Sequence, residues 1–163
     1  MNNTLPISKK EQILNVIESK MHEIKRKNIA YDDVHYANDV GYVDRQFVNI
    51  TPEDIQKHGI NWVLINENNH EWNPLVGGQF ENKLSIEIVA FTQVLNKKEN
   101  LSTKMNSLQK DIHTAILRDV ELNNLCSYIV PISDSPVTDM IYPYGGIILR
   151  FDITYVTQSR LDF

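Results

Sequence analysis

Residues 145–157 are the stretch that most limits how this chain can fold. Two sets of side chains alternate along it: Ile147, Leu149, Phe151, Ile153 and Tyr155 against Ile148, Arg150, Asp152, Thr154 and Val156. Alternation with a period of two in β-branched and aromatic residues is typical of a strand with one buried face. Such a strand must be held by sheet partners, so other strands are expected upstream.

Three helices are expected from apolar spacing and capping residues. A helix over about residues 9–27 begins with a capping box, in which Ser8 and Glu11 bond each other's backbone N–H groups. A second long helix is expected over about residues 102–120, where apolar residues repeat at helical spacing. A short helix begins at Thr51, which is followed by a proline and two acidic residues.

The remaining regular segments are predicted to be strands. They are expected over residues 60–65, 82–94 and 128–132, with extended chain and a turn near Asn38 in residues 30–50. Pro131 cannot donate to a sheet ladder, which places it at a sheet edge, a strand end or a bulge. The Asn-rich residues 66–74 are expected to form a polar loop or a long hairpin.

The order of these elements predicts an α+β fold. We expect a single mixed, mainly antiparallel sheet with two long helices packed on one face. A length of 163 residues is ordinary for one domain, so residues 1–163 are interpreted as a single domain.

Charge is distributed unevenly along the chain. The formal net charge is −5, but residues 1–27 contain six Lys and Arg against three Glu. A solvated first helix accounts for this distribution. The alternative is a basic helix that complements the acidic body of a neighbouring subunit. The negative total argues against a general nucleic-acid binder.

No catalytic or ligand-binding motif is found in the sequence. It contains no G-x-S-x-G elbow, P-loop, H-E-x-x-H or paired C-x-x-C pattern. The histidines lack ligand spacing, and we expect His113 to face solvent and His70 to lie exposed in its polar loop. These patterns predict no catalytic residue, no cofactor and no metal.

Three features of the sequence bear on where in the cell the protein is expected. No apolar run approaches the roughly 18 residues of a membrane span, and residues 1–6 do not resemble the start of a signal peptide. The single cysteine, Cys126, cannot form an internal disulfide, which suits synthesis in a reducing cytoplasm.

The last third of the sequence resembles a known family. A helix containing Lys110-Asp111-Ile112-His113-Thr114-Ala115-Ile116 is followed by a short strand, a loop bearing Asp134 and Asp139, and the closing strand at 146–155. This pattern is similar to the tail terminator, or tail completion (minor tail), proteins of long-tailed bacteriophages. The resemblance covers most of the chain in element order and about residues 82–158 in residue pattern. The Asn-rich segment at 66–74 and the short helix after Thr51 depart from it.

The resemblance implies a structural, non-enzymatic virion protein. Such a protein forms a ring, usually hexameric, that caps the finished tail tube, stops its growth and joins it to the head-side connector. The partners implied are other copies of the chain, the tail tube protein and the connector, with no membrane and no sequence-specific nucleic acid, although DNA passes through such a lumen. Assembly in the host cytoplasm and a final place in the virion's tail-neck region follow. On this interpretation Arg150, Asp152 and Thr154 face a neighbouring subunit or the lumen.

Other functions fit the same residues. A neck, head-completion or tail-tube-like protein would share the particle and the fold. A small α+β enzyme or nucleotide-binding module, or an unrelated cytoplasmic interaction protein, would share only the fold class.

Overall fold

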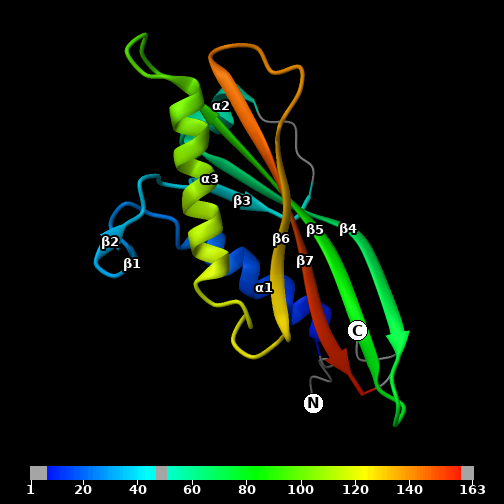
Figure 1. Cartoon of the computed structure of the whole chain (residues 1–163). Coiled ribbons are helices and arrows are strands. Elements are labelled where there is room, and N and C mark those ends of the chain that lie inside the picture. The colour runs from blue at the N-terminus through cyan, green and yellow to red at the C-terminus, as the bar shows by residue number, and fades with distance from the viewer. Residues whose placement is uncertain (1–6, 47–50, 159–163) are drawn as a thin grey trace, which may run out of the picture.

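The predicted closing strand is β7 (Tyr144–Thr157), and it lies within a five-stranded mixed sheet (Figure 1). The computed structural model describes residues 7–46 and 51–158. The strand order is β3 (Tyr42–Asp44), β4 (Trp62–Pro74), β5 (Phe80–Gln93), β7 and β6 (Tyr128–Pro136). β3 pairs with β4 in parallel and the other neighbours pair antiparallel. A small separate sheet contains β1 (Ile29–Tyr31) and β2 (Val34–His35).

The alternation predicted for β7 is confirmed. Its five inward residues are buried: Ile147, Leu149, Phe151, Ile153 and Tyr155. They lie opposite the apolar positions of β5, with Leu149 beside Ile88 and Phe151 beside Ile86. This pairing places the largest aliphatic and aromatic side chains of both strands on one face, where burial stabilises the sheet.

The two long helices bury side chains in the same hydrophobic core as that face of β7. α1 (Lys9–His22) contributes Ile13, Leu14, Ile17 and Met21, and α3 (Leu101–Leu117) contributes Leu108, Ile112, Ala115 and Ile116. The 3.6-residue period of a helix brings each set onto one stripe. The α+β class and the mixed sheet are therefore as predicted.

Helix starts agree with the sequence better than helix ends. Ser8 Oγ accepts a hydrogen bond from the N–H of Glu11 at 3.2 Å, and α2 (Pro52–His58) begins with a complete capping box at Thr51. α1 ends at His22 rather than near residue 27. After the C-cap Glu23 the N–H of Ile24 bonds the carbonyl of Met21 at 3.2 Å, and Asn28 Nδ2 donates to the carbonyl of Glu23 at 2.7 Å.

β4 is much longer than predicted. Residues 66–74 continue the strand instead of forming a loop, and they pair with β5 as far as Pro74 opposite Phe80. The long hairpin that the sequence left open is therefore the observed form. Its turn contains Gly77 and Gly78, both at positive φ, a conformation that glycine adopts without strain. In Figure 1 the distal part of this hairpin extends beyond both long helices.

The region expected to be extended at 30–50 contains three short strands, β1, β2 and β3. Its expected turn near Asn38 is held by Asp111 of α3. One carboxylate oxygen of Asp111 accepts from the N–H of Ala37 at 3.0 Å, the N–H of Asn38 at 2.9 Å and Asn38 Nδ2 at 2.8 Å. Residues 47–50 of the expected segment lie outside the described residues.

Pro131 lies in an edge strand, where a residue without a backbone N–H is tolerated. β6 is an edge strand of the sheet, and its register with β7 shifts between Pro131 and Ser133. A missing backbone donor is tolerated at an edge and at a bulge, so this prediction is confirmed.

Candidate assembly surface

The outer face of β7, opposite the core, contains the three residues predicted for subunit contacts, Arg150, Asp152 and Thr154. Arg150 Nε donates to Glu87 Oε1 on β5 at 2.6 Å. Its Nη1 lies 3.5 Å from Ser133 Oγ and 3.4 Å from Ser135 Oγ on β6. Arg150 therefore bridges both neighbouring strands, while its side chain stays 36% exposed.

Asp152 forms the second charged contact of this face. Lys83 Nζ lies 2.8 Å from Asp152 Oδ2, and Ser85 Oγ donates to Oδ1 at 2.6 Å. Burial acts to raise the pKa of Asp152, but the hydrogen bonds from Lys83 and Ser85 outweigh it and hold the pKa below its ordinary value. We call Arg150, Glu87, Asp152, Lys83 and Ser85 the charge ladder.

Replacing Asp152 by asparagine is expected to make the free energy of unfolding vary less with pH in the acid range. The pKa of Asp152 is lower in the folded chain than its ordinary value of 3.8. Its carboxylate therefore stabilises the fold at pH values above 3.8, and this stabilisation is lost as the pH falls through the lower pKa of the folded chain. Asp152→Asn should thus lower the unfolding free energy by up to about 1 kcal/mol at neutral pH and leave it unchanged well below pH 3.8. Urea unfolding at both pH values measures this.

The matched control is Asp139→Asn in the loop after β6. Asp139 is exposed and has a positive φ, which asparagine tolerates. That variant should follow the wild type at every pH. A constant gap between Asp152→Asn and the wild type across the acid range would contradict a role for the ion pair.

Thr154 contributes little accessible surface. It is 6% exposed, between Lys83 of β5 and Tyr128 of β6 in the register of the sheet. Of the three predicted residues, Arg150 and Asp152 therefore retain partly exposed polar atoms, and Thr154 is enclosed by its own sheet.

Apolar side chains accompany the charge ladder along the sheet edge. Tyr128, Val130 and Ile132 of β6 are 49%, 40% and 53% exposed. Tyr128 lies opposite Thr154 and Val130 opposite Asp152. A row of exposed apolar residues beside half-buried charges is common at the rims and cores of protein interfaces.

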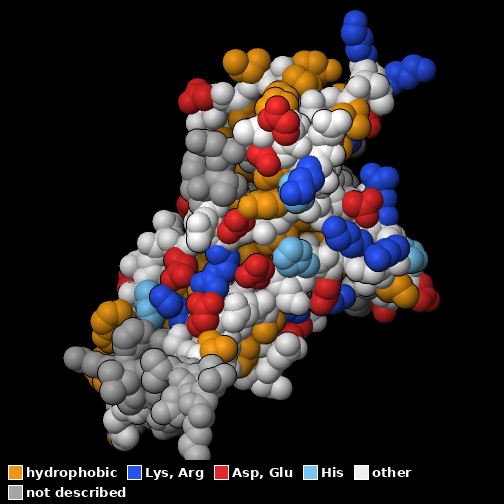
Figure 2. Space-filling view, turned by 180° about the vertical axis from the view of Figure 1, so that it is seen from behind, with side chains coloured by type: hydrophobic (Ala, Val, Ile, Leu, Met, Phe, Trp, Pro, Cys, Tyr) orange, Lys and Arg blue, Asp and Glu red, His pale blue; other side chains and the backbone are white. Residues whose placement is uncertain are grey.

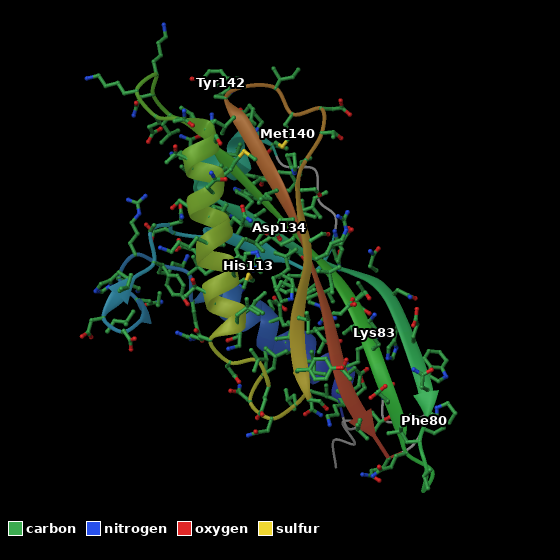
Figure 3. The ribbon with its side chains drawn as sticks, viewed as in Figure 1. Phe80, Lys83, His113, Asp134, Met140 and Tyr142 are labelled. Carbon is green, nitrogen blue, oxygen red and sulfur yellow. The ribbon has the colours of Figure 1, made fainter. Side chains whose placement is uncertain are left out.

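A second apolar region lies at the end of the molecule where α3 begins. It consists of exposed residues from two loops and the start of β7: Leu95, Ile141, Tyr142 and Tyr144. The N–H of Val94 donates to the carbonyl of Pro143 at 3.0 Å, which joins the two loops. Hydrophobic side chains gather at this end in Figure 2, and Figure 3 labels Met140 and Tyr142 there. We call this region the apolar end.

His113 is not solvent-facing as predicted. Its Nε2 lies 2.9 Å from Asp134 Oδ2 on β6, and Gln109 Nε2 donates to the same oxygen at 2.5 Å (Figure 3). The imidazole also lies 5.4 Å from the ring of Phe151. The sequence could not reveal this contact because the partners are 21 residues apart and meet only when β6 joins β7. The group anchors the edge strand to α3.

His70 also lies in a different environment from that expected. It is half-buried on β4, and its Nε2 is 3.0 Å from the hydroxyl of Tyr155 on β7. Burial lowers the pKa of His70, and the nearby Lys10 lowers it further. The expected exposed loop position is wrong because residues 66–74 form a strand that packs this imidazole onto the sheet.

Three basic side chains from α1 and the segment after it contact acidic side chains of the same chain. Lys10 Nζ is 2.8 Å from Glu67 Oε2, Lys20 Nζ is 3.6 Å from Asp119 Oδ2 and Arg26 Nε is 3.5 Å from Asp39 Oδ2. Figure 2 shows acidic and basic side chains intermixed across the middle of this face. These pairs place part of the basic charge of residues 9–27 against acidic side chains of the same chain.

A groove separates α3 from the β1–β2 hairpin. Its volume is about 790 Å³. The lining residues come from both elements: Ala30, Val34, His35, Ala37, Thr103, Asn106, Ser107, Lys110, Asp111, Thr114 and Arg118. Asp111 accepts hydrogen bonds from Ala37 and Asn38, as described above, so its carboxylate is already occupied. The sequence contains no local signal for this groove, because it depends on how the hairpin docks on the helix.

Two kinds of site are absent from residues 7–46 and 51–158. No group of three or more His, Cys, Asp or Glu side chains in these residues is arranged to hold a metal ion. No helix in these residues is long and apolar enough to cross a membrane. Cys126 is buried, which raises the pKa of its thiol to about 11, so the thiol is inert rather than activated.

The sequence was compared with models of protein families and with curated proteins. No family model matches the chain, and no curated protein matches it.

Proposed function

We propose that this chain is a structural subunit of a phage tail that assembles into a ring, usually of six copies, on the completed tail tube. The ring ends tube growth and provides the joint to the head-side connector. In this proposal the protein is not an enzyme, it needs no cofactor, and it resides in the tail-neck region of the virion after assembly in the host cytoplasm.

The observation that carries the proposal is the partly exposed outer face of the sheet at β7 and β6; farther along the same face, Trp62 and Leu64 of β4 are buried. We take α1 and α3 to cover one face, which leaves the charge ladder and the exposed apolar residues of β6 on the other. Half-exposed ion pairs contribute only about 0–1 kcal/mol each. Arg150 can therefore exchange a contact with Glu87 for one with a neighbouring copy at little cost, while the apolar residues of β6 supply buried area.

The pairing of the charged groups in the charge ladder also supports a structural role. Its charged groups are paired across strands at 2.6–2.8 Å, an arrangement that favours matching to another protein surface over attack on a small substrate. A protein that stops a polymer needs one surface that mates with the last subunit and another that does not propagate. The charge ladder and the apolar end lie on different parts of this molecule and can serve these two roles.

Reversal of Arg150 is expected to weaken ring assembly. Arg150→Glu places two carboxylates together at Glu87 and removes the cation offered to a neighbour, so the ring population should fall while the monomer stays folded. Mass photometry, alone and with tube protein, measures the ring, and circular dichroism measures the fold. Electron microscopy of tubes assembled with the variant should show longer tubes than with the wild type.

The control restores the internal pair in reverse. In Glu87→Arg/Arg150→Glu the two side chains can pair again within the chain, so the internal ion pair is restored but the charge that position 150 presents to a neighbour stays reversed. Assembly should remain weak in this double variant. Full recovery would assign Arg150 a purely internal role, and a wild-type chain that stays monomeric and leaves tube length unaffected would overturn the proposal itself.

A further inference from the structure

The side chain of His70 joins β4 to a strand with which β4 does not pair. β5 lies between β4 and β7 in the sheet, yet His70 Nε2 is 3.0 Å from the hydroxyl of Tyr155 on β7. The two rings are nearly parallel, with an interplanar angle of 16°. The side chain of Asn82 on β5 also hydrogen-bonds the imidazole. One titratable side chain therefore links three strands, and we call His70, Tyr155 and Asn82 the histidine cluster.

The hydroxyl of Tyr155 depends on the imidazole for an acceptor. Tyr155 is 0% exposed, and burial raises the pKa of its hydroxyl, which therefore stays protonated. A neutral imidazole carries a proton on one ring nitrogen only, so the other nitrogen can accept from the hydroxyl. An imidazolium carries N–H at both nitrogens and cannot accept. Protonation of His70 thus leaves a buried O–H without this acceptor, which costs free energy.

The charges around His70 also oppose a positive imidazole. Among the described residues, Lys10 of α1 and Glu67 of β4 act on it. Glu67 is already paired with Lys10 at 2.8 Å and lies 3.5 Å from Arg45 Nη2. β5 and β7 face the imidazole with uncharged side chains: Asn82, Leu84, Ile153 and Tyr155. Burial is the largest effect and lowers the pKa of His70, and Lys10 lowers it further, while Asn82 and Glu67 act in the opposite direction.

The histidine cluster lies just beyond an irregularity in β4. The register of β4 with β5 shifts between Glu67 and Asn69, and a bulge of this kind bends a strand and interrupts its ladder. We call residues 69–74 the outer segment of β4. β3 pairs with β4 over residues 62–64 and does not reach the outer segment, while β5 stays paired with β7 along its whole length. The outer segment can therefore move without disturbing the rest of the sheet.

We propose that His70 is a pH-sensitive latch: its neutral imidazole holds the outer segment of β4 on the sheet through Tyr155, and its protonation releases that segment. This latch goes beyond the proposed function, because it acts within one chain and needs no assembly. An imidazole in a released segment is solvated and has the ordinary pKa of 6.5, whereas the pKa in the docked segment is lower. Docking is therefore strongest above pH 6.5 and weakens as the pH falls from 6.5 to the lower pKa of the docked state.

Hydrogen exchange of the full wild-type chain, at a pH above 6.5 and at one well below it, tests the latch. After correction for the intrinsic effect of pH on exchange, the outer segment should lose protection in acid, and residues 147–153 of β7 should keep theirs. The released population should rise by about tenfold for each unit by which docking lowers the pKa of His70. An NMR titration of the His70 imidazole measures that difference independently.

Two histidine variants separate the latch from a general effect of acid. In His70→Gln the amide oxygen can still accept from the Tyr155 hydroxyl but does not titrate, so the outer segment should stay protected at both pH values. His22→Gln is the matched control, because His22 is an exposed histidine of α1, and this variant should keep the acid response of the wild type. An equal acid response in His70→Gln and the wild type would overturn the latch. The wild-type titration decides even where glutamine packs poorly, since a His70 pKa of 6.5 or above in the folded chain would also overturn it.

Discussion

Replacing Leu149 by alanine is expected to lower the free energy of unfolding by about 2–5 kcal/mol. Leu149 is fully buried in β7, opposite Ile88 of β5 and within the core shared by both long helices. The truncation removes buried methyl and methylene groups from a strand paired on both edges, where the surroundings cannot collapse into the space. Urea unfolding followed by circular dichroism measures the loss.

The neighbouring residue provides the control. Ile148 lies on the opposite face of the same strand and is only half-buried. Ile148→Ala removes a side chain of similar volume, but from a site open to water, so its cost should be clearly smaller than that of Leu149→Ala. Equal costs at the two positions would show that both faces of β7 are covered, and the open outer face on which the proposed assembly depends would be lost.

Replacing Asp111 by alanine is expected to destabilise the chain by an amount on the order of 3 kcal/mol. The carboxylate is 6% exposed and accepts the backbone N–H groups of Ala37 and Asn38 as well as Asn38 Nδ2. Removing it leaves buried donors without an acceptor, which costs more than the hydrogen bonds contribute. Thermal unfolding should show Tm lower by about 2–4 °C for each kcal/mol lost.

Asn106→Ala, one turn earlier on α3, is the matched control. Asn106 is exposed, and alanine is the better helix former, so this variant should match or slightly exceed the wild type in stability. If Asp111→Ala were equally harmless, the β1–β2 hairpin would not depend on α3 for its position. The groove between α3 and this hairpin would then have no fixed wall.

Prediction from sequence succeeded where a local pattern determines the structure. The two faces of β7 follow from period-two alternation, because a strand turns successive side chains to opposite sides whatever its partners are. Thr51 starts α2 because its capping box forms within four residues of chain. Pro131 could be assigned to an edge because a missing donor has the same consequence in any sheet.

Prediction failed where the partner is distant in the chain. His113 and Asp134 meet only after β6 has paired with β7, and His70 is buried only because Tyr155 lies across the sheet. The anchoring role of Asp111 depends on residues 73 and 74 positions away. None of these contacts leaves a mark in the neighbouring sequence.

The length of β4 illustrates a different limit. Residues 66–74 are rich in Asn and low in strand propensity, yet they pair with β5 along their whole length except near Asn68, where the register shifts. β5 alternates strongly and pairs with β7 over the same stretch. The extended backbone of β5 therefore stabilises a strand in residues 66–74, although their own strand propensity is low. The long β4–β5 hairpin is the result, and the sequence indicated it only as one of two alternatives.

Two prolines on β6 affect how this chain meets others of its kind. An open edge strand normally invites another strand, and repeated addition leads to aggregates that grow without limit. β6 ends at Pro136 and contains Pro131 beside an irregularity, so an incoming strand would find two donors missing and the ladder broken. We therefore expect copies to meet through side chains rather than by pairing one β6 edge with another.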